Sequence, residues 1–92
     1  MALSGQKTVT TAGTAVALGA QAIRGPLAIK AFPTNTGLVY VGNSGNNDVD
    51  SNTGYHLSKN EEVVLKSVTN LSDVWVDVAV NGEGVAWLDL GF

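Results

Sequence analysis

The sequence predicts an all-β protein, a small β-sandwich or barrel of about eight short antiparallel strands. Val (13 residues) and Thr (8 residues) are abundant in the 92-residue chain, and both favour strands. Gly (11 residues) and Asn (8 residues) favour turns. Hydrophobicity alternates with a period of two, and turn signals recur about every 8 to 12 residues, which is typical of sandwiches and small barrels.

The N-terminal third is expected to hold three strands. Residues 7–11 and 14–18 flank Ala12-Gly13 and predict a short hairpin. Residues 26–32 follow, with alternating side chains. Residues 1–6 are expected to form an N-terminal arm that adds a strand to a partner, and residues 1–92 to form one domain.

The middle of the chain combines a turn, a strand and a long loop. Residues 33–37, Pro-Thr-Asn-Thr-Gly, form a turn because Pro fixes φ and Gly permits positive φ. Residues 38–41 are the next strand, with Val39 and Val41 on one face. Residues 43–54 are almost entirely Asn, Gly, Ser and Asp, which predicts a surface loop.

The C-terminal half is expected to contain four strands. Residues 55–58 and 62–68 flank a turn. Residues 73–80 form the longest strand and place four valines on one face. A turn at 81–84, Asn-Gly-Glu-Gly, leads into the last strand, 85–90.

Charge and composition exclude several classes of protein. The formal net charge is −3, and only five Lys and Arg are present, so no basic stripe for nucleic acid can be assembled. No apolar run approaches the ~20 residues of a membrane span, and the N-terminus carries no signal-peptide pattern. The chain has no Cys, which fits folding in a reducing cytoplasm. We therefore expect neither nucleic acid nor membrane as a partner.

A calcium-like pattern occurs in the long loop. Asp48, Asp50 and Asn52 are spaced as in an Asp-x-Asp-x-Asn loop. An EF-hand then requires Gly at the sixth position and Glu at the twelfth, where this chain has Thr53 and Lys59. We expect a solvated turn, and no metal or cofactor.

Candidate catalytic groups are few. His56 is the only histidine, and Ser58 lies two residues on, on the same strand face. A triad also needs an orienting carboxylate and an oxyanion hole, which the sequence does not show. Asp77 and Asp89 would form a glycosidase-like pair if their strands were neighbours, although outward-facing surface charges are the commoner explanation. We expect no catalytic residue and no enzymatic activity.

The aromatic residues indicate an interaction surface. If the valine face of 73–80 is the core, Trp75 points away from it. By the same alternation Phe32, Tyr40 and Trp87 also lie off the main apolar face. Such a face would be too apolar for a soluble monomer, so we expect these four residues to pack at an interface between subunits or with a partner. Sugar stacking is the competing use.

The order of motifs resembles a known module. The run TVTTAGTAVALGAQAIRGPLAIKAFPTNTGLVYVGN starts at Thr8, and the runs NTGYHLSKNEEVVL and NLSDVWVDVAVNGEGVAWL follow it. These runs are similar to a small β-sandwich module of tailed-phage virion proteins. Members of that family include capsid decoration (cement) proteins, head-fibre bases and tail-associated proteins, commonly trimers or larger assemblies. The resemblance implies no catalytic or cofactor residue.

The expected function is therefore decoration of a phage capsid. The resemblance implies a protein made in the host cytoplasm that binds the outer surface of the virion. Its partners would be the major capsid protein and copies of itself in a trimer. The alternatives are a tail, baseplate or head-fibre component, a carbohydrate-binding module that uses Trp75 and Trp87, and, least favoured, an enzyme built on His56 and the acidic residues.

Overall fold

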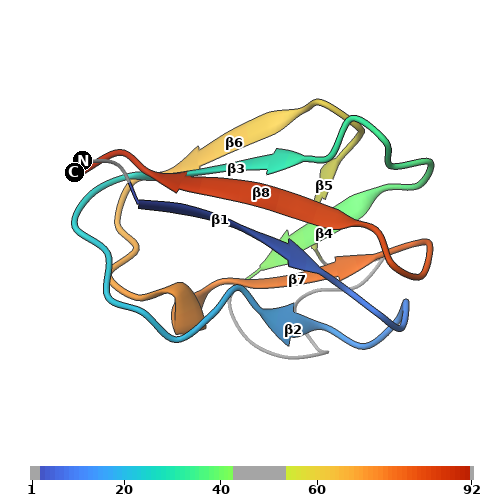
Figure 1. Ribbon diagram of the computed structural model, residues 1–92, viewed down its shortest axis with the longest axis horizontal. Coiled ribbons are helices and arrows are strands. Elements are labelled where there is room, and N and C mark those ends of the chain that lie inside the picture. Colours follow the sequence, from blue (N-terminus) through green and yellow to red (C-terminus); the bar gives the residue numbers. More distant parts are fainter. Residues whose placement is uncertain (1–2, 43–53, 92) are drawn as a thin grey trace.

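Two four-stranded antiparallel sheets pack face to face in the computed structural model, which describes residues 3–42 and 54–91 (Figure 1). The predicted all-β class and the β-sandwich are confirmed. A single short 3-10 helix, η1, occurs within the described ranges. The elements are β1 (Leu3–Thr8), β2 (Val16–Ala17), β3 (Leu27–Ala31), β4 (Val39–Gly42), β5 (Tyr55–Leu57), β6 (Glu62–Leu65), η1 (Leu71–Asp73), β7 (Trp75–Val78) and β8 (Gly84–Asp89).

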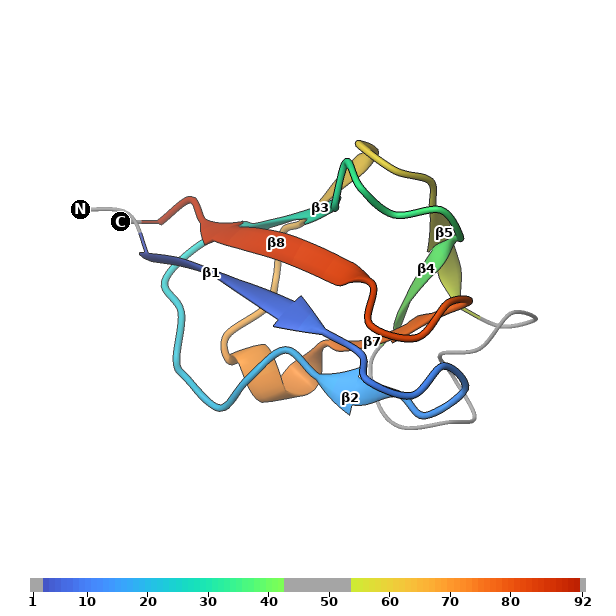
Figure 2. The ribbon, with the colours of Figure 1, turned by 45° about the vertical axis from the view of Figure 1, so that its right-hand side comes forward.

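The two sheets have different strand orders. Sheet A runs β1-β8-β3-β6, and sheet B runs β2-β7-β4-β5. Figure 2 shows β1 and β8 in one layer, with β2 and β7 in the layer below. Each sheet draws strands from both halves of the chain, so neither half can fold into a sheet without the other.

The expected hairpin between residues 7–11 and 14–18 is wrong. β1 belongs to sheet A and β2 to sheet B, so the chain crosses between the layers here. Val9, at the crossing, is fully buried, and its backbone exchanges hydrogen bonds with Gly82 and Glu83. The turn at Ala12-Gly13 does form, and the N–H of Thr14 donates to the carbonyl of Thr11 at 3.1 Å, but this turn connects the two sheets and closes no hairpin.

The N-terminal arm expected over residues 1–6 is corrected as well. From Leu3 onward the segment is an integral strand of its own sheet, because β1 pairs with β8 along its entire length, from Leu3 opposite Asp89 to Thr8 opposite Gly84. β1 thus occupies one edge of sheet A (Figure 1).

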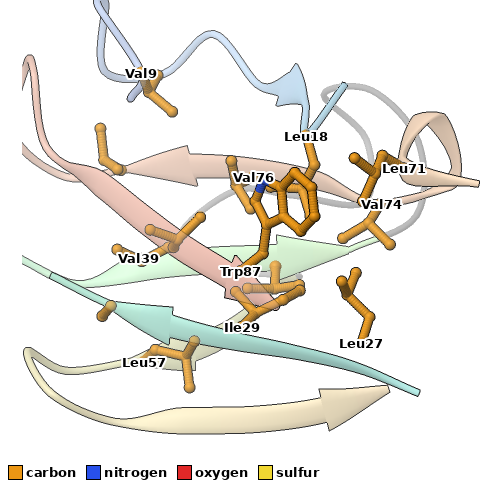
Figure 3. Close-up of a cluster of buried hydrophobic side chains, with 14 of the residues drawn as sticks. Val9, Leu18, Leu27, Ile29, Val39, Leu57, Leu71, Val74, Val76 and Trp87 are labelled. Atoms are coloured by element: carbon orange, nitrogen blue, oxygen red, sulfur yellow. The ribbon is translucent and has the colours of Figure 1, made fainter. Parts of the chain in front are cut away.

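The core lies between the inner faces of the sheets. Val76 and Val78 of β7 are buried as the valine pattern predicts, whereas Val80 lies beyond the strand and is 41% exposed. Side chains from all parts of the described chain meet in this layer (Figure 3). Its largest fully buried aliphatic members are Val9, Leu27, Ile29, Val39, Val76, Val78 and Val85.

Candidate interaction surface

Trp87 lies in the core, contrary to the prediction that it faces outward. It is 8% exposed, belongs to the main buried cluster and projects between the sheets beside Leu18 and Val76 (Figure 3). The alternation along β8 was assigned correctly, but the inner face is the one that carries Val85, Trp87 and Asp89. Trp87 therefore stabilises the fold and is not available to a partner.

Tyr40 and Trp75 lie on the outer face of sheet B, as the alternation predicts, but both are covered. Tyr40 is 8% exposed and packs with Ala15 and the half-buried Trp75. The indole Nε1 of Trp75 donates a hydrogen bond to the carbonyl of Ser72 at 3.1 Å. The two aromatic residues thus form a small second cluster that attaches the 11–15 segment to sheet B.

Phe32 follows the last residue of β3 and is half-buried. Its backbone N–H donates to the carbonyl of Gly84 at 3.2 Å, and its carbonyl accepts from Asn35. The four aromatic residues proposed as one interface are therefore distributed over the core, the outer face of sheet B and the end of β3.

The two carboxylates that the sequence analysis considered as a pair are not brought together. Asp77 lies in sheet B and Asp89 in sheet A, so the carboxylate pair does not form between neighbouring strands. Asp77 is buried and accepts a hydrogen bond from the N–H of Gly13 at 3.0 Å. His56 is exposed and meets the ring of Tyr40 edge-on, with 5.2 Å between ring centroids.

Asp89 holds the end of sheet A together. Its carboxylate accepts hydrogen bonds from the N–H groups of Arg24, Gly25 and Gly91 at 2.9–3.2 Å. Burial raises the pKa of Asp89, but these three donors and the charge of Arg24 outweigh it and hold the pKa below its usual value. The carboxylate is therefore charged at neutral pH and acts as a structural acceptor.

Glu83 plays the same role at the other end of the sandwich. Its carboxylate accepts from the N–H of Gly37 at 3.0 Å and from both the N–H and the hydroxyl of Thr36. The Gly37 N–H lowers the pKa of Glu83 most, partial burial opposes it, and the two Thr36 donors lower it further. The 33–37 turn is thereby attached to the turn between β7 and β8.

The outer face of sheet A is an apolar surface that the sequence assigned to the core. Cross-strand pairing places Leu88 of β8 beside Ala28 of β3, and Ala28 beside Val64 of β6, in one row. Val64 is 42% exposed, and Leu90, at the end of β8, is 48% exposed. Ala86, Leu88 and Leu90 alternate with Trp87 along the last strand, so the prediction that Trp87 lies off the main apolar face made this side the inward one. We call this row and Leu90 the sheet A face.

Charge on the sheet A face is balanced. Lys30 and Glu62 are cross-strand partners on it, and Ser4, Gln6 and Thr8 of β1 form its neutral polar margin. In a chain with net charge −3, this face combines exposed aliphatic side chains with no local excess of negative charge. Such a patch is typical of a protein–protein contact.

A groove of about 700 Å³ lies beside this face, along β6 and the segment that follows it. Val41, Tyr55, Val63 and Val74 provide apolar walls, and Lys66 and Asp73 are its charged members. Tyr55 is 60% exposed at the rim. The groove increases the apolar area available on this side of the molecule.

The calcium-like residues Asp48, Asp50 and Asn52 lie outside the described residues. Within residues 3–42 and 54–91, no three His, Cys, Asp or Glu side chains gather as metal ligands would. No helix in the same ranges has the length and apolarity that crossing a bilayer requires.

Comparisons with protein-family models, with curated proteins and with solved structures found no match to this chain.

Proposed function

We propose that this protein is a non-enzymatic structural module that binds the outer shell of a tailed-phage capsid through its sheet A face. The observation that carries the proposal is the aliphatic row of Leu88, Ala28 and Val64, extended by Leu90. Val64 and Leu90 are exposed, Leu88 is half-buried, and Ala28 is buried between its two neighbours in the row. The phage setting comes from the resemblance in motif order. The fitting partner surface is a protein patch with an aliphatic centre and little net charge.

Docking would stabilise the shell without covalent change. Each copy that bridges two capsid subunits removes apolar area from water, and binding to the assembled shell alone shifts the equilibrium toward the assembled state. Each contact is modest, but the number of copies makes the total large. The net charge of −3 disfavours contact with packaged DNA, which fits a position outside the shell.

A matched pair of variants tests the docking face. Val64 and Val80 are almost equally exposed, at 42% and 41%, but only Val64 lies on the sheet A face. Val64→Asp should weaken binding to particles that lack the protein by roughly tenfold or more, because the carboxylate is buried without a partner. Val80→Asp should bind like the wild type. Circular dichroism checks that both variants fold, and equal binding by both would reject this face.

Copy number and particle stability test the role. Deleting the gene should leave particles that assemble but burst at lower temperature or under milder osmotic shock. Quantitative mass spectrometry of purified particles should count hundreds of copies. A handful of copies located at the tail would favour the tail or baseplate alternative. The carbohydrate-binding alternative loses one of its two stacking platforms, because Trp87 lies in the core.

A further inference from the structure

The edges of the two sheets differ in length and charge. β1 and β6 are the edges of sheet A, and β2 and β5 are the edges of sheet B. Proteins avoid unwanted pairing with edge strands that are short or charged. β2 has two residues, β5 has three, and β6 has four that begin with Glu62. β1 is the exception, with six residues and Lys7 as its one charged side chain.

The hydrogen-bonding direction of β1 follows from its neighbours. Val9 exchanges backbone hydrogen bonds with Gly82 and Glu83, on the β8 side. Because the direction alternates along an antiparallel ladder, Lys7, Gly5 and Leu3 also face β8. The N–H and C=O groups of Ser4, Gln6 and Thr8 therefore point away from the sheet.

These three residues form an uncharged pairing edge. Among the residues that the structure describes, their backbone groups have no hydrogen-bond partner. Their side chains are neutral and exposed, and no proline interrupts the strand. Main-chain groups in this arrangement are what an added antiparallel strand requires.

The side chain of Lys7 limits which strand can pair with the free edge of β1. Its side chain is half-buried on the inner side of β1, and an inward-facing charge at an edge normally blocks pairing, because it lies against the neighbour's side chain. When β1 pairs with a second β1 about Gln6, Lys7 lies opposite Gly5 of the second copy, where the indole of Trp87 occupies the place of a side chain. A Lys side chain can lie against an indole, which attracts its charge. Pairing with β6 of another copy, centred on Val64, instead places Lys7 opposite Val63.

We propose that two copies of this chain associate through β1, antiparallel across a two-fold axis at Gln6. Ser4 then pairs with Thr8 of the second copy, and Gln6 with its own counterpart, each pair exchanging two backbone hydrogen bonds. Sheet A becomes one eight-stranded sheet. The two sheet A faces then form a continuous surface, although the pairing itself does not depend on binding to a capsid.

Charge substitutions at the axis test the symmetry. Gln6→Glu and Gln6→Lys each place like charges opposite each other in the homodimer, which should weaken self-association by about fivefold. An equimolar mixture places opposite charges together, so native mass spectrometry should find heterodimers above the statistical half. Gln21, the other glutamine, is exposed and lies outside β1, and Gln21→Glu and Gln21→Lys serve as matched controls that should dimerise like the wild type.

A backbone substitution tests the hydrogen bonds themselves. Gln6→Pro removes an N–H that faces away from β8, so the β1–β8 ladder should survive while the dimer is lost. Sedimentation equilibrium gives the oligomeric state, and circular dichroism checks the fold. A wild-type monomer at about 1 mM, a trimer, or a dimer that Gln6→Glu and Gln6→Lys both leave intact would each overturn the proposal.

Discussion

Gly5 of β1 and Trp87 of β8 lie directly opposite each other, and the indole ring occupies the space where a side chain at Gly5 would stand. A Cβ added at Gly5 would lie 2.8 Å from Cζ2 of Trp87 and 3.0 Å from Cε2. The absence of a side chain at residue 5 thus allows the largest side chain of β8 to pack against the edge strand.

Gly5→Ala should therefore destabilise the protein. Overpacking of this kind costs about 1–3 kcal/mol, measured as the free energy of unfolding in urea. The cost should be smaller by at least about 0.5 kcal/mol in a Trp87→Phe background, because a phenyl ring lacks the atoms nearest to residue 5. Ser4→Ala, on the outer side of β1, is the control. An equal cost in both backgrounds would show that the two residues do not interact.

The same pair shows how far the sequence predicts the fold. Alternation correctly placed Val85, Trp87 and Asp89 on one face of the last strand, and the turns at 33–37 and 81–84 were located by their Pro, Gly and Asn residues. Which face is buried depends on Gly5, far away in sequence, and on the donors around Asp89. Local patterns carry no information about such long-range pairing.

The expected hairpin failed for a similar reason. Residues 7–18 contain a local turn signal, but the hydrogen bonds that place Val9 come from Gly82 and Glu83. The sheet A face was misassigned because both faces of β8 are hydrophobic, and the buried Asp89 made the true inner face look polar. A buried, satisfied carboxylate cannot be distinguished from a surface one by its sequence neighbours.

Trp87→Ala separates a core role from an interface role. With Trp87 between the sheets, truncation should cost about 3–5 kcal/mol of folding free energy, a large part of the stability of so small a domain. Thermal unfolding of dilute protein measures it. A variant that keeps wild-type stability and loses only self-association would restore the original assignment of Trp87 to an interface.

Glu83 and Asp89 make the free energy of unfolding depend on pH in the acidic range. Both have pKa values lowered in the folded state, so their stabilisation is fully present above about pH 5 and is lost as pH falls through the lowered values. Glu83→Gln should reduce stability at pH 7 and flatten its decline between about pH 5 and pH 3. Urea midpoints across this range provide the measurement, and the exposed Glu62→Gln is the control. Parallel curves of stability against pH for Glu83→Gln and the wild type would contradict this role of the Glu83 carboxylate.

His56 is expected to stabilise the fold through the contact of its ring with Tyr40. Its ring meets Tyr40 edge-on at an interplanar angle of 71°, an arrangement worth about 0.5–1.5 kcal/mol. His56→Ala should lose at least the ring contact in the free energy of unfolding, and His56→Phe should recover that part, because a phenyl ring also offers an aromatic edge to Tyr40.

Ser58→Ala, two residues further along the chain, should change the free energy of unfolding little. Ser58 is exposed, and the hydrogen bond from its backbone N–H to the carboxylate of Glu61 does not depend on its side chain. Particle binding should be the same for His56→Ala and His56→Phe, because the ring lies on the face of sheet B and the proposed contact lies on sheet A. A loss of particle binding in both variants, with folding intact, would move the docking surface to the opposite side of the sandwich.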